Sequence, residues 1–429
     1  MQPVQATATA AARLTPTPSP APSATPAPRL GKVAFLRGGD AWALNLDTGE
    51  QARLTEGGNV SHPRWSPSGE WLSFFRGKEL WITQASGGAP RRISDLAISQ
   101  AAWSPVQDEL AYVTNAGGLY VASPSGPSPK EIIPGPGSEG AGVGAFTWSP
   151  DGQQLAFEWT EMKPGAPPTY QGLRRIRSDG TNLNEIYTAF HLPTQADTVM
   201  LSSWSPDGSR VCFWTFPEES PSLAADGIPL SCVPSTGGEP TQVAQAMLPE
   251  PRFVAWSPNG EQLALISGLN RETWFNKTLV VVSDDGHETK SLTAVDEIAL
   301  SPSWTPNGKR LAFVCAPAMQ GVIGGDVAKI SLANRRICSI EATGKNKQQL
   351  TNETQFRDEH PLWSLDGASI LFLRLQEQSP NIRASLWTMN SDGAQLKQVA
   401  SELSPLPDSF GFYGLSDWSA VFDWWKGPP

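Results

Sequence analysis

The sequence predicts an all-β fold in which four-stranded antiparallel sheets stack radially into a closed ring, and three observations lead to this prediction. A tryptophan followed by a turn sequence recurs seven times, at intervals of about 38 to 59 residues, and a period in this range is typical of repeat architectures. Two large apolar residues stand seven and nine positions after each of these tryptophans. Each unit then continues with further short strands and glycine-containing turns. The predicted fold is therefore a β-propeller.

The turn after each tryptophan reads Ser-Pro-x-Gly in most copies. Proline fixes its own φ, Asp or Asn bonds its own backbone in an Asx-turn, and glycine adopts the positive φ that closes a tight hairpin. The repeated tryptophans are Trp65, Trp103, Trp148, Trp204, Trp256, Trp304 and Trp363.

The paired apolar positions predict the strand that follows each turn. Their spacing of two places both side chains on one face of a strand. The pairs are Leu72 and Phe74, Leu110 and Tyr112, Leu155 and Phe157, Val211 and Phe213, Leu263 and Leu265, Leu311 and Phe313, and Ile370 and Phe372. One such sheet cannot bury its faces alone, so the blades must stack and close on themselves.

The chain ends predict how the ring closes. Residues 32–35, 42–45 and 52–55 read as the second, third and fourth strands of a blade without a first strand. Residues 412–419, which include Trp418, read as a first strand without a blade behind it. Together they predict eight blades, the last built from both termini; if Trp418 only caps the ring, the alternative is seven. The predicted domains are a linker (1–31), one propeller (32–425) and a tail (426–429).

The repeat resembles the TolB-like, WD-repeat-related β-propellers, over about residues 32 to 425. The resemblance rests on Trp-Ser-Pro-Asp-Gly followed by Leu-Ala-Phe, as in the unit that begins at Trp148. That family includes periplasmic binding proteins, receptor ectodomains and gating domains of hydrolases, so the resemblance implies the fold and says little about function. TolB carries an α/β domain ahead of its propeller, and hydrolases of this kind carry a Gly-x-Ser-x-Gly elbow. Neither is found here, so neither Tol-system nor peptidase function is expected.

Composition and the N-terminal segment favour an exported protein. The formal net charge is -10, and Lys and Arg are dispersed, which argues against nucleic-acid binding. No apolar run approaches the roughly 20 residues of a membrane span. Residues 1–29 consist mainly of Ala, Thr, Pro and Ser and are expected to form an extended spacer. Such spacers often separate an exported domain from a membrane anchor, so we expect a tether whose leader has been removed; the alternative is a merely disordered terminus.

The four cysteines fall in two units as candidate disulfide partners. Cys212 and Cys315 lie in predicted second strands, and Cys232 and Cys338 lie in the third strands beside them. Antiparallel neighbours come within disulfide reach, and two bridges would suit an oxidising compartment. The alternative is that a thiol such as Cys212 serves only as core packing.

Aromatic residues mark the best candidate ligand-binding rim. Several connections between second and third strands are longer than the scaffold requires. Those of three consecutive blades carry Trp159 and Tyr170, Trp214 and Phe216, and Trp274 and Phe275. Aromatic clusters suit either a sugar or a protein partner, whereas the alternative is that they cover the ends of their own blades. We expect Trp274 to be the most exposed of them.

A catalytic site is the second candidate. His62 and His360 each stand three residues before a repeated tryptophan, and Asp358 and Glu359 precede the second histidine. If both imidazoles face the channel mouth, a metal-assisted lyase or hydrolase could use these four residues. The alternative is that each imidazole bonds a backbone carbonyl. No Cys-x-x-C motif is present, and the Ser-Asp-Gly sequences are those of hairpin turns, so no metal or cofactor is expected.

The function predicted from the sequence is a monomeric, non-enzymatic binding or scaffold module of the cell envelope. It would be periplasmic, cell-surface or secreted, and its ligand would be a protein or a carbohydrate. The alternatives are a propeller enzyme acting on polysaccharide and the extracellular sensor domain of a receptor.

Overall fold

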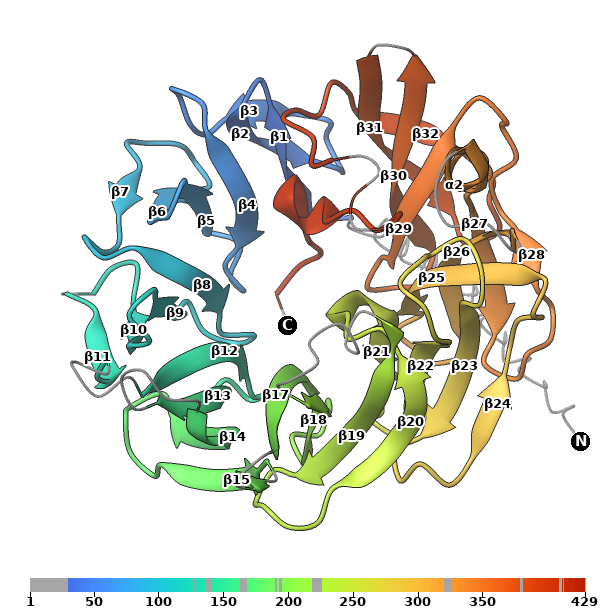
Figure 1. Ribbon diagram of the computed structural model, residues 1–429. Coiled ribbons are helices and arrows are strands. Elements are labelled where there is room, and N and C mark those ends of the chain that lie inside the picture. The colour runs from blue at the N-terminus through green and yellow to red at the C-terminus, as the bar shows by residue number, and fades with distance from the viewer. Residues whose placement is uncertain are drawn as a thin grey trace, which may run out of the picture.

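A computed structural model describes residues 30–428 apart from 127, 136–140, 163–167, 190, 193–194, 218–225, 320–325, 379–380, 409–410 and 412. Eight antiparallel sheets stand around a central channel (Figure 1), which confirms the eight-bladed β-propeller. Residues 1–29 of the predicted linker lie outside the described part of the chain. Leu30 and Gly31, also assigned to that linker, instead contact the last blade.

Blades 1 to 4 follow one another in chain order, each starting at the channel. Blade 1 is β4 (Val60–Trp65), β5 (Trp71–Arg76), β6 (Glu79–Gln84) and β7 (Arg91–Arg92). Blade 2 is β8 (Ile98–Trp103), β9 (Leu110–Thr114), β10 (Leu119–Ala122) and β11 (Lys130–Ile133). Blade 3 is β12 (Gly142–Trp148), β13 (Gln154–Met162), β14 (Pro168–Arg177) and β15 (Asn184–Thr188). Blade 4 is β17 (Gln195–Trp204), β18 (Arg210–Pro217), β19 (Ile228–Pro234) and β20 (Thr241–Met247), with the short β16 (His191–Leu192) beside β17.

Blades 5 to 7 repeat this order. Blade 5 is β21 (Val254–Trp256), β22 (Gln262–Ser267), β23 (Thr278–Ser283) and β24 (Thr289–Ser291), preceded by the 3-10 helix η1 (Pro251–Phe253). Blade 6 is β25 (Glu297–Trp304), β26 (Arg310–Pro317), β27 (Arg336–Glu341) and β28 (Gln348–Gln349), with helix α2 (Asp326–Ala333) before β27. Blade 7 is β29 (Arg357–Trp363), β30 (Ser369–Gln378), β31 (Asn381–Asn390) and β32 (Lys397–Ala400).

Blade 8 closes the ring with strands from both ends of the chain. It consists of β1 (Lys32–Arg37), β2 (Asp40–Asn45), β3 (Gln51–Arg53) and β33 (Phe422–Trp425), and β33 pairs antiparallel with β1. The shared blade is therefore confirmed, but the expected first strand at 412–419 is wrong. Trp418 lies instead in the 3-10 helix η2 (Trp418–Ala420), because the Asp417 carboxylate accepts the Ser419 N–H and caps a helical turn there.

The core lies between neighbouring blades, on both faces of each second strand. All fourteen apolar residues predicted at positions seven and nine after the tryptophans are at most 1% exposed. The residue between them is also buried in each blade, for example Ala111 and Ala264, so both faces of every second strand are covered. The predicted stacking of the blades is therefore confirmed.

The repeated tryptophans join each blade to the one before it. Trp103 Nε1 donates to the carbonyl oxygen of Arg64, at 3.1 Å, and Trp148 Nε1 donates to that of Ala102, at 3.0 Å. The pattern continues through Trp204, Trp256, Trp304 and Trp363, and the acceptor always belongs to the residue just before the preceding blade's tryptophan. Trp65 Nε1 is an exception, since it has no hydrogen-bond partner within the described ranges.

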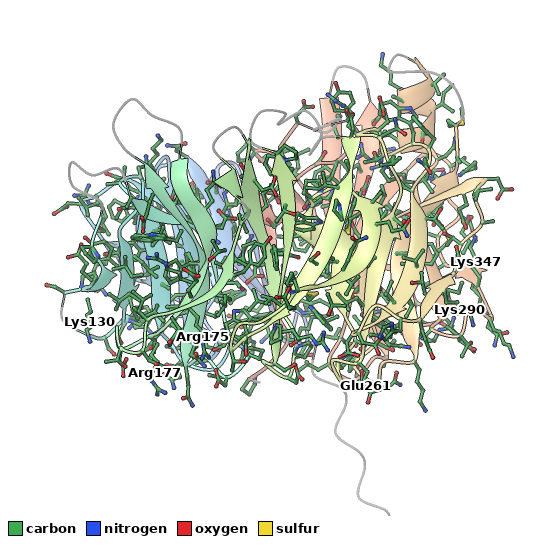
Figure 2. All side chains as sticks on the ribbon, turned by 60° about the horizontal axis from the view of Figure 1, so that its bottom comes forward. Lys130, Arg175, Arg177, Glu261, Lys290 and Lys347 are labelled. Atoms are coloured by element: carbon green, nitrogen blue, oxygen red, sulfur yellow. A yellow bond between two sulfur atoms is a disulfide. The ribbon has the colours of Figure 1, made fainter. Side chains whose placement is uncertain are left out.

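The turns after the tryptophans have the predicted chemistry. In blade 3, Ser149 Oγ donates to Asp151 Oδ1 at 2.6 Å, and the same carboxylate accepts the Gln153 N–H at 3.0 Å. Gly152 follows with a φ of 67°, a value that favours glycine. Figure 2 shows that Glu261, in such a turn, and Arg177, at the end of a third strand, lie toward the same side of the ring. We call this side the lower face; the connections between second and third strands form the upper face.

Candidate functional site

The C-terminal segment 413–420 crosses the central channel, where Figure 1 shows it in red inside the ring. On the side of blade 1, His62 Nε2 lies 3.4 Å from Asp417 Oδ2. Arg64, one residue before the first repeated tryptophan, donates from Nη1 to the carbonyl oxygen of Ser419 at 2.6 Å. Burial alone would raise the pKa of Asp417, but hydrogen bonds from His62 and Ser419 outweigh it and lower that pKa. Asp417 is therefore a carboxylate at neutral pH.

Blades 5 and 6 hold the same segment from the other side. Arg252, in η1, donates from Nη1 to the carbonyl oxygen of Ser416. Arg335, just after α2, donates from Nη1 to the carbonyl oxygen of Gly414 at 2.7 Å. Thr273 Oγ1 donates to the carbonyl oxygen of Tyr413 at 2.9 Å. The chain's own C-terminal backbone thus accepts hydrogen bonds from arginines that would otherwise face the channel.

The two histidines occupy equivalent places, as predicted, in the blades on either side of blade 8. Both have left-handed backbones, with φ of 51° at His62 and 55° at His360, where the first strands are irregular. His62 contacts Phe75 edge-on at 6.2 Å, and His360 contacts Phe422 edge-on at 5.6 Å. Burial, reinforced by the positive charge of Arg252, lowers the pKa of His360 to about 4. His360 is therefore neutral at physiological pH.

Asp358 and Glu359 are not brought together with the histidines as free carboxylates. Asp358 is fully buried and binds Arg374 through both oxygens, at 2.7 and 3.0 Å. Glu359 Oε1 accepts from Arg335 Nη1 and from Arg357 Nε, each at 2.7 Å. Burial alone would raise the pKa of Glu359, but the charges of the two arginines lower it. The structure thus uses both carboxylates in buried ion pairs, so the four-residue constellation is not assembled.

The candidate rim aromatics differ in exposure. Trp214 and Trp274 are fully buried, so the expectation that Trp274 would be exposed is wrong. Trp274 packs against Ala328 and Leu332 of α2, a helix that the repeat pattern did not predict. Sequence reasoning therefore missed the cover over this indole.

Three rim aromatics remain partly exposed near the upper face. They are Trp159 and Phe216, in the second strands β13 and β18, and Phe275, in the connection from β22 to β23. Trp159 Nε1 donates to Glu161 Oε1 at 2.9 Å, and the Arg174 guanidinium lies 4.7 Å from the ring centroid. The side chain of Tyr170 lies outside the described part of the structure. Ligand binding by these residues stays a prediction.

Both predicted disulfides are present. Cys212 bonds Cys232 directly opposite it in the ladder, and Cys315 bonds Cys338 diagonally. Two disulfides in one chain indicate an extracytoplasmic protein.

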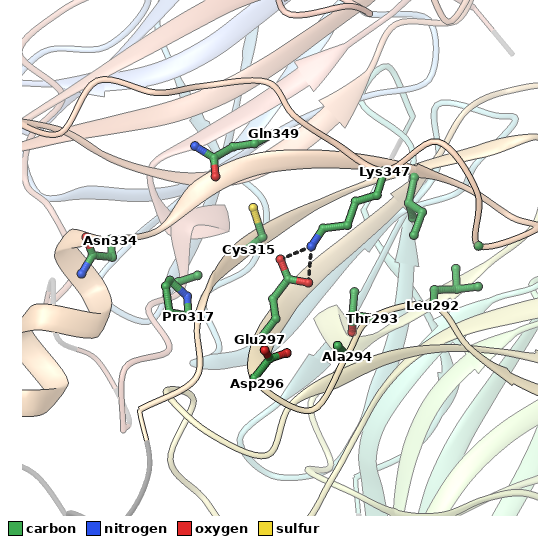
Figure 3. A pocket seen from close by; sticks show the side chains of 13 residues that line it. Leu292, Thr293, Ala294, Asp296, Glu297, Cys315, Pro317, Asn334, Lys347 and Gln349 are labelled. Carbon is green, nitrogen blue, oxygen red and sulfur yellow. Dashed lines mark hydrogen bonds and ion pairs between the residues drawn. The ribbon is translucent and has the colours of Figure 1, made fainter.

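A cavity of about 560 Å³ lies between blades 5 and 6, beside the Cys315–Cys338 bond. Figure 3 shows the side chains that line it, among them Lys347, whose Nζ forms an ion pair with Glu297. The Glu297 carboxylate and the sulfurs of Cys315 and Cys338 lie within 4.8 Å of one another. Because the disulfide consumes both thiolates and Lys347 pairs with the carboxylate, this group is not suited to binding a metal in the oxidised protein.

No helix within the described ranges is long and apolar enough to cross a membrane.

Comparisons with known proteins identify the fold. No protein-family model and no curated protein matches the sequence. Among solved structures, dipeptidyl peptidase 4 from Porphyromonas gingivalis is similar with a TM-score of 0.57 and 12% identity, over 90% of this chain and 61% of that one. A Mycobacterium tuberculosis puromycin-hydrolyzing peptidase is similar with a TM-score of 0.50 and 15% identity, over 89% and 55%. A putative TolB from Agrobacterium tumefaciens has a TM-score of 0.36 and 11% identity, over 93% and 99%.

These likenesses bear on architecture alone. The chain spans 55–61% of the length of the two peptidases, and identities of 12–15% to them show a shared fold only. The eight blades of the structure confirm the propeller fold that the sequence resemblance implied: this chain is an eight-bladed β-propeller with a ring closed by both termini.

Proposed function

We propose that this protein is a non-enzymatic binding module of the cell envelope that presents its upper face to a ligand. The observation that supports this most directly is the crossing of the channel by residues 413–420. The Asp417 carboxylate pairs with His62, and backbone carbonyl oxygens of the segment accept hydrogen bonds from Arg64 and Arg252. The polar groups that an enzyme would need at the channel mouth are thus employed in holding the chain's own end.

The buried carboxylates support the same proposal. A general acid or base, or a metal ligand, needs a side chain that the substrate or ion can reach. Asp358 and Glu359 are enclosed with arginines, at most 4% exposed as side chains. The charges of Arg335 and Arg357 also lower the pKa of Glu359, so that this carboxylate has no proton to donate.

The upper face offers the contacts that a ligand would use. Trp159 is partly exposed, and its indole contacts both members of the Arg174–Glu161 ion pair. Trp and Arg are enriched among the residues that contribute most of the binding energy at protein interfaces. We therefore favour a protein partner over a glycan, with the chain ahead of residue 15 acting as the spacer to an anchor.

The test is affinity capture from native envelope extract. The wild type is compared with Trp159→Ala/Phe216→Ala/Phe275→Ala, and both captured proteins and captured glycans are analysed. The matched control is Leu183→Ala, which removes a side chain that is 51% exposed at the lower face. Capture of a protein by the wild type and the control, but not by a folded triple variant, supports the proposal. Equal capture by all three, or capture of glycan alone, contradicts it.

The enzyme alternative has its own test. His62→Ala should leave any activity on polysaccharide unchanged if the histidine only holds Asp417. A loss of measured turnover in a variant with unchanged thermal stability would favour the enzyme and overturn the binding-module proposal.

A further inference from the structure

The lower mouth of the channel carries a groove lined by indole and proline rings. Two hollows, of about 470 and 560 Å³, adjoin each other at Trp103 and Pro105. Trp425 and Leu365 line the first hollow, and Trp148 and Pro150 line the second. Leu365 is 54% exposed and stands where most of the other turns carry proline. We call these six residues the lower-mouth groove.

The fold brings the N-terminal segment to the edge of this groove. Trp424, which also lines the first hollow, donates from Nε1 to the carbonyl oxygen of Leu30 at 2.7 Å. The Leu30 N–H donates to Asp47 Oδ1 at 2.7 Å. Leu30, where the described part of the chain begins, therefore lies at the rim, because the N- and C-terminal strands of blade 8 replace a continuous turn at this point.

The segment just before Leu30 has the composition that such a groove binds. Residues 15–28 contain six prolines and no charged residue. A polyproline II helix rises about 3.1 Å per residue, so fourteen residues reach about 43 Å. Aromatic-lined grooves bind proline-rich segments because the helix is preformed and loses little entropy on binding, while its rings pack on indole faces.

We propose that residues 15–28 bind as a polyproline II helix in the lower-mouth groove of their own propeller. Attachment at Leu30 supports this occupant over a separate peptide, since a short tether gives an effective concentration in the millimolar range. The site is at the opposite face from the ligand surface proposed above, and it does not depend on that proposal. The propeller thus carries a binding site for proline-rich chain that its own N-terminal segment occupies.

The test uses the full chain with 5-fluorotryptophan and a nitroxide. All four cysteines are in disulfides, so Ser23→Cys provides one reactive thiol for the spin label. The ¹⁹F lines are assigned with Trp103→Phe and Trp148→Phe. Because the nitroxide broadens the signals of nearby nuclei, we expect the ¹⁹F lines of Trp103, Trp148 and Trp425 to lose most of their intensity. Lines from the third-strand residues Trp42, Trp81 and Trp387 should keep theirs.

Two variants separate docking from chance proximity. The variant Pro16→Ser/Pro18→Ser/Pro20→Ser/Pro22→Ser keeps the length of the segment. It should restore the intensity of the ¹⁹F lines of Trp103, Trp148 and Trp425, which we call the groove lines. Leu365→Asp places a charge in the groove at an exposed turn and should also restore them, whereas Leu183→Asp, exposed to a similar degree elsewhere on the lower face, should not.

Three results would overturn the proposal. The first is equal attenuation of all tryptophan lines, and the second is attenuation of none. The third is attenuation of the groove lines in a mixture of fluorinated unlabelled chain and labelled non-fluorinated chain, which would assign the groove to the segment of a second copy.

Discussion

Replacing Glu359 by glutamine should destabilise the ring strongly. The carboxylate accepts two charged hydrogen bonds of 2.7 Å from side chains that are only 1% exposed. Removing one partner from a buried ion pair costs about 3–5 kcal/mol, because the remaining charge stays buried and unpaired. Arg335 keeps its bonds to Gly414 and Thr273, so we expect the lower half of that range.

This loss of free energy of unfolding corresponds to a modest decrease in the melting temperature. With an unfolding entropy of about 2.1 cal/mol/K per residue, a ring of about 400 residues has roughly 0.8 kcal/mol/K at its midpoint. A loss of about 3–4 kcal/mol then lowers Tm by about 4–5 °C.

Differential scanning calorimetry with a matched control decides the matter. Glu353 also pairs with an arginine, Arg374, but its side chain is 40% exposed, and such pairs contribute only about 0–1 kcal/mol. Glu353→Gln should therefore shift Tm by about 1 °C or less. If Glu359→Gln and Glu353→Gln have equal Tm values, the argument from the buried arginines fails.

Three further predictions concern the disulfides, the half-buried histidine and the tryptophans. Cys212→Ser/Cys232→Ser should lower the free energy of unfolding by about 3 kcal/mol, from a closed loop of about 20 residues, and Cys315→Ser/Cys338→Ser should do nearly the same; a change in urea midpoint for only one pair would contradict this. The pKa of His360 is about 4 in the folded chain, against an ordinary value of 6.5, so the unfolded chain binds the extra proton and stability falls as pH drops from about 6.5 to about 4. Urea titrations should show a flatter pH dependence in that window for His360→Gln, and an unchanged slope would contradict the assignment. Trp148→Phe removes a bond to Ala102 and should cost about 1 kcal/mol more than Trp65→Phe, whose indole nitrogen has no partner within the described ranges; equal urea midpoints would show that these bonds contribute nothing.

The repeat can be predicted because the same turn residues and the same apolar pair recur in seven units. The pair at Leu155 and Phe157, for example, indicates a strand in the same way as its six counterparts, so an irregular unit does not change the predicted fold. The closing strand was misplaced because Asp417-Trp418-Ser419 imitates the repeat, whereas Phe422 and Trp424 supply the alternation that pairs with β1.

The site was less predictable because it depends on contacts between distant segments. The histidine positions followed from their place in the repeat, but the partner of His62 lies more than 350 residues away, at Asp417. The burial of Trp274 by α2 likewise arises from an insertion that breaks the periodicity. The arginine partners of Asp358 and Glu359 had no sequence pattern that distinguished them from surface charges.

The pairing of β1 with β33 in blade 8 has a consequence for how the protein can fold during its synthesis. β1 is synthesised before, and β33 after, all strands of the other seven blades, so the inner edge of β1 has no partner until those blades have been made. An unpaired edge strand is a template for pairing with other chains. Vectorial synthesis or translocation from the N-terminus would leave that edge open until β33 emerges, and only then can the ring close.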